Sequence, residues 1–208
     1  MKKIWDISPS LQPGIPVWPG DTAYEETRTW ELDENCPVNV SRYTMSTHTG
    51  AHVDAPFHYD PHGIKAGEMD LNRYLGVCQV IDLTGLSRPI SIANVKNVFE
   101  ENIQKVLFKT YEYAPQHAWD SNFISIEAAT IEWLASKDVH LVGVDTASLD
   151  PQDSKTLDAH HMVKKHGLSI LEGIVLDDVS AGKYELIALP LKLANLDAAP
   201  VRAILREI

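Results

Sequence analysis

Short alternating or continuous apolar runs recur along the chain and predict β-strands, because side chains of a strand point alternately to its two faces. β-Branched residues are frequent in these runs, and glycine, proline or asparagine bound several of them. The proline-rich first 24 residues predict an extended arm with turns, since proline fixes φ and discourages helix. The predicted strands cover residues 25–32, 38–46, 75–84, 105–110 and 140–146, with several more within 173–206.

Three other segments have helical character. Ser91 is a candidate N-cap for a helix reaching Phe99, and Ser125 for a helix through Leu134. A third helix is expected over residues 156–166, ended by Gly167. Because strands outnumber helices and the two interleave, the pattern predicts one α/β domain over residues 1–208. Its mixed, barrel-like β-sheet would be flanked by a few α-helices.

Composition narrows the function. The chain has 208 residues, an ordinary apolar fraction of 44% and a formal net charge of -11. This charge argues against nucleic acid and anionic membranes as partners. Cys36 and Cys78 match no zinc-finger or CxxC spacing. No signal peptide and no run of the roughly 20 apolar residues needed to span a bilayer is evident, so we expect a cytoplasmic protein.

Candidate chemistry concentrates in one short segment. His48, His52, Asp54 and His58 all occupy even positions, so in an extended strand they would share one face. Pro56 is expected to bend or end the strand before His58. Three imidazoles and a carboxylate on one face are costly to bury unless a partner, such as a metal ion, satisfies them. The competing interpretation is an exposed strand whose polar residues face water.

The donor set indicates which metal would fit. Imidazole and carboxylate suit Zn²⁺, and also Mn²⁺ or Fe²⁺. The absence of thiolates argues against a closed structural site, and a mixed His/carboxylate set is typical of catalytic zinc with an open position.

The same residues carry a family resemblance. The segment Ser-Thr-His48-Thr-Gly50-Ala-His52-Val-Asp54-Ala-Pro56-Phe-His58 resembles the HxGTHxDxPxH signature of the metal-dependent cyclase-like hydrolases, with alanine at position 51 in place of threonine. Similarity to the bacterial kynurenine formamidases (arylformamidases) of this family extends over nearly the whole chain. It includes the opening Ile-Trp-Asp6-Ile-Ser-Pro, the Val-Trp18-Pro-Gly20-Asp21 loop, the Val-Gly143-Val-Asp145-Thr strand and the stretch from His160 to Gly173.

The resemblance implies a ligand set for two zinc ions per subunit, with Mn²⁺ as the alternative metal. His48, His52 and Asp54 match the ligands of the first ion. His160 and Glu172 match the remaining ligands, and Asp54 and Glu172 would bridge the two ions.

The resemblance also implies an activity. His58 matches a general acid/base, and Trp18 matches an aromatic that contacts substrate. The implied reaction is hydrolysis of N-formyl-L-kynurenine to L-kynurenine and formate by a metal-activated water, a step of tryptophan catabolism. Members of the family are typically cytoplasmic homodimers. Whether Trp18 would serve its own subunit's site or a neighbour's is left open.

The sequence around His160 and Glu172 gives each of these two assignments some support of its own. His160 lies at the edge of an apolar stripe on the third predicted helix and His161 points further away, which favours His160 as the inward residue. Glu172 follows an apolar run, where a carboxylate needs a counter-charge.

Three alternatives stay open. A related enzyme could hydrolyse a cyclic amide such as isatin, since the ligand set would be shared. A non-catalytic small-molecule or metal-binding protein is disfavoured by the spare histidine, His58. A serine or cysteine hydrolase is disfavoured because no GxSxG motif occurs.

Overall fold

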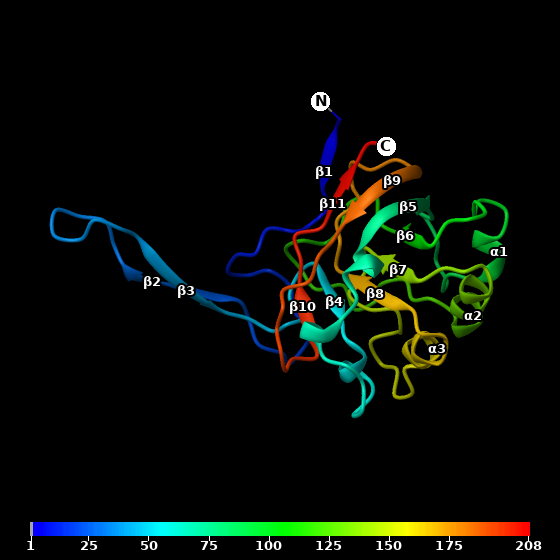
Figure 1. Cartoon of the computed structure of the whole chain (residues 1–208), viewed down its shortest axis with the longest axis horizontal. Helices are drawn as coiled ribbons and strands as arrows, with labels where there is room; N and C mark the ends of the chain where they lie inside the picture. The colour runs from blue at the N-terminus through cyan, green and yellow to red at the C-terminus, as the bar shows by residue number, and fades with distance from the viewer. Residues whose placement is uncertain (1) are drawn as a thin grey trace.

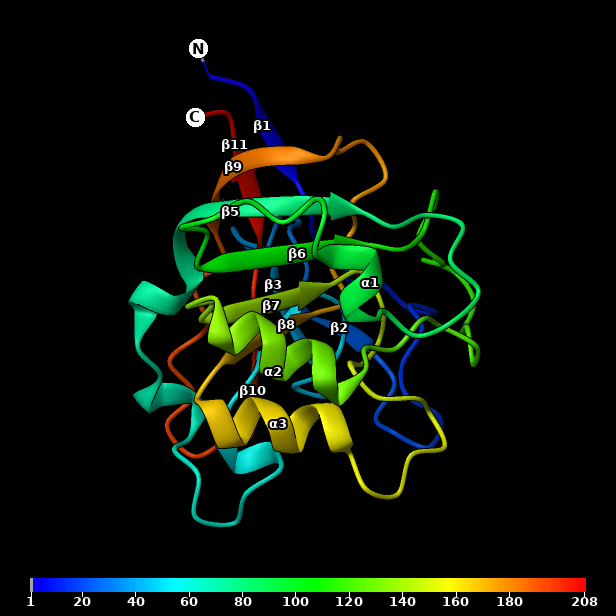
Figure 2. The same ribbon diagram turned by 90° about the vertical axis from the view of Figure 1, so that its right-hand side faces the viewer.

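The computed structural model describes residues 2–208 and is a single α/β domain built on a curled, mixed β-sheet (Figures 1 and 2). The sheet strands are β1 (Ile4–Asp6), β4 (His52–Asp54), β5 (Leu75–Asp82), β6 (Lys105–Lys109), β7 (Leu141–Val144), β8 (Ser169–Glu172), β9 (Gly182–Ile187), β10 (Ala198–Pro200) and β11 (Ile204–Arg206). The helices are α1 (Ile92–Val95), α2 (Ala128–Ser136) and α3 (Asp158–His166), with short 3-10 turns η1 (Pro56–His58), η2 (Ala66–Glu68) and η3 (Leu71–Tyr74). This architecture confirms the predicted fold class.

The strand order is β1-β11-β9-β5-β6-β7-β8-β4-β10. The central strands β5, β6, β7 and β8 run parallel, and the pairings outside them are antiparallel. Every residue of β6 and β7 is buried, as expected for parallel strands covered on both faces. Because the carboxyl ends of parallel strands meet at one edge of a sheet, the loops after β6, β7 and β8 gather there.

Alternation along these strands separates two apolar cores. Val106 and Phe108 of β6 face the cluster that also contains Ile131, Leu134 and Val163 from helices α2 and α3. Leu107 lies between them in the sequence and belongs to the second cluster, which packs on the concave face of the curled sheet. The helices therefore cover one face of the central strands, as Figure 2 shows.

A second, two-stranded sheet projects from this body. Strands β2 (Glu25–Trp30) and β3 (Val40–Thr44) pair as an antiparallel hairpin. The hairpin and the helices lie on opposite sides of the body (Figure 1). We call residues 24–44 the arm. Both predicted strands of this region are confirmed within a few residues.

Several predicted elements need correction. The extended segment expected from His48 to His58 forms a strand only over β4, because a tight turn with positive φ at Gly50 precedes it. Pro56 ends the strand as predicted, but opens η1. Helix α2 has Glu127 rather than Ser125 as its N-cap, and α1 ends at Val95, short of Phe99.

Two further expectations concern the third helix and membrane spans. Helix α3 ends where Gly167 adopts a left-handed conformation, with φ of 65°, as the sequence predicts. Among residues 2–208, no helix has the length and apolar character needed to cross a membrane.

Candidate metal centre

Strands β4 and β8 bring the first predicted site residues together. In their antiparallel ladder His52 lies directly opposite Glu172, and Asp54 lies opposite Ile170. Directly opposed side chains of a ladder lie on the same face. Ile170 belongs to the core beneath the helices, so His52, Asp54 and Glu172 face the helical layer. The prediction that the even-numbered site residues share one face of a strand is therefore confirmed for His52 and Asp54.

Two further histidines approach this face from other elements. His160 projects from the first turns of α3, is 2% exposed, and places Nε2 3.5 Å from Asp54 Oδ2 and 3.8 Å from Glu172 Oε1. This confirms His160, and not the exposed His161, as the inward residue of the helix. His48 reaches the site from the turn before β4, with Nδ1 3.1 Å from Asp54 Oδ1.

The buried polar atoms of this cluster fit a metal ion. Both carboxylate oxygens of Asp54 and Nε2 of His52 are buried without a hydrogen-bond partner. The contacts of His52 Nε2 with Asp54 and Glu172, each 3.5 Å, lack hydrogen-bond geometry. Orphaned buried acceptors are costly unless a cation or donor satisfies them. Imidazole and carboxylate donors arranged in this way suit a divalent ion such as Zn²⁺ or Mn²⁺.

In His160 and His52, the ring nitrogen that points away from the carboxylates of the cluster has its own hydrogen-bond partner. Nδ1 of His160 lies 2.6 Å from Asp150 Oδ2, and Nδ1 of His52 lies 2.9 Å from the carbonyl oxygen of Gly50. A histidine that donates one N–H to a carboxylate or carbonyl presents its other nitrogen to a metal. In both residues that free nitrogen is Nε2, which faces the carboxylates of the cluster.

His58 lies at the rim of the site and is exposed. Its ring centroid is 4.3 Å from that of His48 and 6.1 Å from that of His160. Asp197 Oδ2 lies 3.0 Å from His48 Nε2 and 3.5 Å from His58 Nδ1, so one carboxylate touches both rings. The potential ligand atoms of Asp54, His58 and His160 also lie within 4.8 Å of one another, so geometry alone permits His58 to bind a metal ion.

Charge coupling shifts the pKa values of the cluster. Burial lowers the pKa of His48, but the contacts with Asp54 and Asp197 outweigh this effect and raise it to about 9. Burial likewise lowers the pKa of His160, while Asp150 and Asp54 raise it to about 10. For Asp54, burial raises the pKa, but the facing histidines hold it well below its usual value. Without a metal, positive imidazoles therefore compensate the buried carboxylate.

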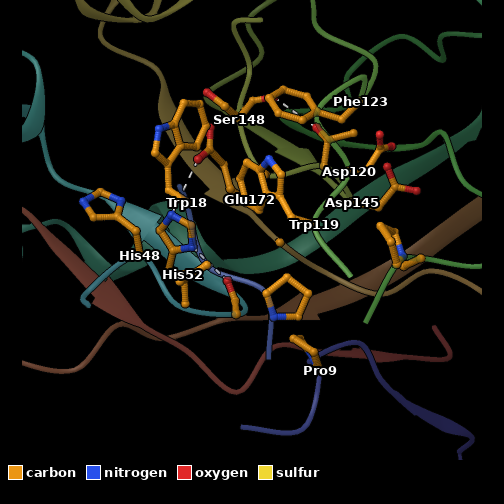
Figure 3. Close-up of a pocket in the computed structure, with 18 of the residues that line it drawn as sticks. Pro9, Trp18, His48, His52, Trp119, Asp120, Phe123, Asp145, Ser148 and Glu172 are labelled. Carbon is orange, nitrogen blue, oxygen red and sulfur yellow. Dashed lines mark hydrogen bonds and ion pairs between the residues drawn. The ribbon is translucent and has the colours of Figure 1, made fainter. Parts of the chain in front are cut away.

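The cluster opens into a pocket of about 530 Å³. Trp18, Trp119 and Phe123 form an aromatic wall, in which the Trp18 and Trp119 rings meet edge-to-face with centroids 5.4 Å apart. Figure 3 shows His48, His52 and Glu172 at one end of the pocket and Phe123, Asp120 and Asp145 at the other. Trp18 thus lines the pocket of its own chain.

Asp145, which follows β7, anchors the pocket wall. Its carboxylate accepts hydrogen bonds from the backbone N–H groups of Thr110 and Tyr111 and from the Thr110 hydroxyl. Burial raises the pKa of Asp145 to about 6, against the lowering effect of these donors. The loop after β6, which carries Trp119 and Phe123, is therefore tied at its start to the end of β7.

Sequence reasoning missed Asp150, Asp197, Trp119 and Phe123. Asp150 is followed by Pro151 and precedes the third predicted helix, so a search for carboxylates in turns before that helix would have found it. Asp197 lies in a polar turn before β10, and nothing local distinguishes it from other surface aspartates. The two aromatics lie in a loop without periodicity, where only tertiary structure shows that they line a pocket.

Solved structures with a similar fold include hydrolases. The chain is 31% identical to a structure described as a "potential metal-dependent hydrolase with cyclase activity", with a TM-score of 0.85 over 100% of this chain and 99% of the other. It is 30% identical to a predicted metal-dependent hydrolase from Bacillus stearothermophilus, with a TM-score of 0.85 and full coverage of both chains. Isatin hydrolase A from Labrenzia aggregata shares the fold at 24% identity, with a TM-score of 0.80 over 99% of this chain and 93% of that chain.

Sequence comparison agrees with this structural similarity. Residues 5–151, which include the candidate ligands His48, His52 and Asp54 together with His58, match the family model Cyclase, described as "Putative cyclase". The match spans well over half of the chain, and His160 and Glu172 complete the buried donor cluster from outside the matched region. The chain therefore belongs to the Cyclase family, and it has the fold of metal-dependent hydrolases together with a metal-binding His/Asp cluster.

Proposed function

We propose that this protein hydrolyses N-formyl-L-kynurenine to L-kynurenine and formate at the metal centre. The observation that carries the proposal is a buried His/carboxylate donor set at one end of a pocket with an aromatic wall. The substrate has an aromatic ring beside the formamide, so ring and scissile bond need neighbouring apolar and polar surfaces. We also propose that the enzyme acts on this small molecule in the cytoplasm.

The donor geometry supports two ions per subunit, with zinc as the proposed metal and manganese as the alternative. Asp54 directs Oδ1 toward His48 and His52, and Oδ2 toward His160. Glu172 directs Oε2 toward His52 and Oε1 toward His160. Each carboxylate therefore faces histidines on two sides, which is what bridging two ions requires. When bound, such ions lower the pKa of water and polarise a carbonyl oxygen.

His58 is the proposed proton donor to the leaving aniline nitrogen. Its ring lies beside those of His48 and His160 but is more exposed than either, so substrate can reach it. The carboxylate of Asp197, 3.5 Å from Nδ1, leaves Nε2 as the nitrogen available for proton exchange. A histidine exchanges protons efficiently near neutral pH.

The aromatic wall is proposed to hold the aryl ring of the substrate. Trp18 comes from the N-terminal loop, whereas Trp119 and Phe123 come from the loop after β6, so the wall combines two separate segments. Trp119 is fixed by a 2.7 Å hydrogen bond from its indole N–H to Gln152. An edge-to-face aromatic contact adds about 0.5–1.5 kcal/mol to the gain from burial.

Hydrolysis of a cyclic amide such as isatin is the second candidate. The fold shared with isatin hydrolase A supports it, and the same wall would accommodate isatin's fused ring. Hydrolysis cleaves an amide C–N bond in both substrates. In isatin that bond lies in a ring, so the amine and carboxylate stay in one product, whereas N-formyl-L-kynurenine releases free formate.

The deciding experiment compares both substrates on protein loaded separately with Zn²⁺ and Mn²⁺. Release of formate and of the aromatic amine is followed for N-formyl-L-kynurenine, and ring opening for isatin. We expect kcat/KM for the formamide to exceed that for isatin, and Trp18→Ala to raise KM. A preference for isatin would replace the first proposal by the second, and inactivity of fully loaded protein on both would remove both.

A further inference from the structure

The end of the pocket that lies away from the metal centre carries negative charge. Figure 3 shows Asp120 and Asp145 at this end, beside Phe123 and opposite His48. Among residues 2–208, no lysine or arginine lines the pocket, and its only basic side chains are the histidines of the metal centre and its rim. A cavity lined by carboxylates attracts positively charged groups and repels anionic ones. The far end of the pocket is therefore suited to a cation.

Asp120 is a carboxylate with acceptor capacity to spare. Its Oδ2 accepts a 2.7 Å hydrogen bond from the hydroxyl of Tyr111, and its Oδ1 accepts a 2.8 Å hydrogen bond from the backbone N–H of Asn122. A carboxylate offers about four acceptor positions, so each oxygen can accept a further donor. Burial and the contact with Asp120 raise the pKa of Tyr111, so its hydroxyl stays protonated and keeps holding the carboxylate.

Two other carboxylates line the pocket outside the metal centre, and neither is as well suited to bind a cation. Asp145 is only 5% exposed, and its oxygens already accept three hydrogen bonds from Thr110 and Tyr111. Asp21 is exposed, so water screens its charge. Asp120 is half-buried, and so it is both accessible from the pocket and less screened than Asp21.

The aromatic wall would place a substrate ring close to this carboxylate. Asp120 directly follows Trp119 in the chain, and Phe123 comes three residues after it. An aryl ring held against Trp18, Trp119 and Phe123 would therefore lie near Asp120. The faces of aromatic rings also attract cations, so the wall and the carboxylate favour the same kind of group. An ammonium on a short chain attached to the ring would satisfy both.

We propose that Asp120 determines substrate specificity by binding an ammonium group carried on the side chain of an aryl formamide. The inference rests on the proposed hydrolysis of N-formyl-L-kynurenine, which carries its α-ammonium on a short, flexible chain next to the formamide. The carboxylate of that substrate finds no lysine or arginine among the described pocket residues, so it remains in water. The enzyme therefore recognises the amine and not the whole amino acid, and its substrates are aryl formamides with a basic side chain.

Substrate analogues that each lack one charge test the proposal. The decarboxylated analogue, N-formyl-kynurenamine, keeps the ammonium, whereas the deaminated analogue keeps the carboxylate. On metal-loaded protein, kcat/KM for the decarboxylated analogue should lie within about threefold of that for N-formyl-L-kynurenine, and for the deaminated analogue it should fall by about 10- to 100-fold, the usual effect of losing a hydrogen bond between charged groups. Equal values for the two analogues, or a preference for the acid, would overturn the proposal.

The variant Asp120→Asn should remove this discrimination. The amide keeps the size of the side chain and can still accept a hydrogen bond from Tyr111, but it carries no charge. We expect kcat/KM to fall by about 10- to 100-fold for both substrates that carry the ammonium, mainly through KM, and to change by less than about threefold for the deaminated analogue. That analogue is the internal control, since misfolding would lower all three values.

Asp21→Asn is the matched control, because it removes the same charge from an exposed residue of the same pocket. It should change each value by less than about threefold. If Asp120→Asn kept the discrimination of the wild type, or if Asp21→Asn had the larger effect, Asp120 would not be the residue that binds the ammonium.

A binding measurement separates this inference from the proposed hydrolysis. Kynurenamine and ortho-aminopropiophenone, its neutral counterpart without the side-chain amine, are titrated into metal-free protein, and quenching of tryptophan fluorescence reports binding at the wall of Trp18 and Trp119. Kynurenamine should bind at least about tenfold more tightly in the wild type, and no more tightly in Asp120→Asn. Added salt should weaken the binding of kynurenamine only.

The two proposals fail on different results. Metal-loaded protein that is inactive on every formamide would remove the proposed hydrolysis, and the binding measurement would still decide the role of Asp120. Equal affinity of the wild type for kynurenamine and its neutral counterpart would overturn that role, even in an enzyme that hydrolyses N-formyl-L-kynurenine.

Discussion

His52 and Glu172 face each other across the β4–β8 ladder, with Nε2 and Oε2 3.5 Å apart. Glu172 is fixed on its other side, where Oε1 accepts a 3.0 Å hydrogen bond from the backbone N–H of Leu149. His52 is fixed by the carbonyl oxygen of Gly50. The backbone therefore aims both side chains before any metal binds, and this preorganisation underlies the following predictions.

Asp54→Asn should abolish stoichiometric metal binding. The amide keeps the shape of the side chain but removes the negative charge that faces His48, His52 and His160. Metal content after dialysis, measured by mass spectrometry, checks this prediction. Asp138→Asn is the matched control, because Asp138 pairs with His140 on the surface. Wild-type stoichiometry in Asp54→Asn would remove Asp54 from the ligand set.

Asp150→Asn should weaken metal binding by about 10- to 100-fold, the usual effect of losing a carboxylate behind a ligating histidine. The amide oxygen of asparagine can replace Oδ1 and keep the hydrogen bond from the backbone N–H of Ala159, while its NH₂ group replaces Oδ2 and can no longer accept from His160. Because one of the two hydrogen bonds to the start of α3 remains, we expect the helix to stay folded. Chelator competition measures the affinity and circular dichroism checks the helix. The exposed Asp153→Asn serves as control, and equal affinities for the two variants would contradict an orienting role.

His58→Ala should retain its metal but lose about 10²- to 10⁴-fold in kcat, the usual contribution of general acid catalysis. Steady-state kinetics on protein of verified metal content gives the value. His62→Ala, at an exposed position in the following turn, is the control. Loss of metal from the His58→Ala protein would instead identify His58 as a ligand, the role that its distance from Asp54 and His160 also permits.

Metal affinity should rise steeply with pH. In the metal-free protein the pKa of His48 is raised to about 9 and that of His160 to about 10, so both are protonated at neutral pH and a metal must displace those protons. We expect an increase of at least about tenfold per pH unit between pH 6.5 and 8.5. Chelator competition across this range, with calorimetry in buffers of different ionisation enthalpy to count released protons, provides the check. Affinity that does not change with pH would contradict the protonated resting state.

The stability of the metal-free protein should have the opposite pH dependence. Folded-state pKa values above the unfolded value mean that these histidines stabilise the fold fully below about pH 6.5. The contribution is lost as pH rises through about 9 for His48 and about 10 for His160. Thermal unfolding of chelator-treated protein should therefore show this contribution declining from pH 7 to 10, and bound metal should remove most of the trend.

Gly173→Ala should weaken both folding and metal binding. Gly173 has φ of 66°, and a Cβ atom there would lie 2.4 Å from the carbonyl oxygen of Gly50. That oxygen orients His52, so the backbone shift needed to relieve the clash reaches a ligand. We expect a loss of about 1–3 kcal/mol in stability, measured by denaturant unfolding of metal-free protein. Gly85→Ala also has positive φ but meets no atom within 4 Å, and so controls for backbone strain alone.

Local patterns in the sequence determined a large part of this molecule. Alternating patterns predicted β2 and β3, and β-rich or continuous apolar runs predicted β5, β6 and β7, each within a few residues, because such patterns are local features of a strand's sequence. The two-residue period of a strand put the even-numbered His52 and Asp54 on one face, and the apolar stripe of α3 placed His160 on its inward side. Gly167 ended that helix where expected, since glycine reaches left-handed φ at little cost.

Tertiary structure alone decided how these pieces meet. His48 enters the site from a turn and not from a strand, because the close approach of Gly50 and Gly173 bends the chain there. Asp150, Asp197 and the aromatic wall join the site through contacts between segments far apart in sequence, and no local periodicity encodes such contacts. The sequence also could not show that the arm stands apart from the body, since an alternating strand has the same pattern whether its apolar face packs on the core or is exposed.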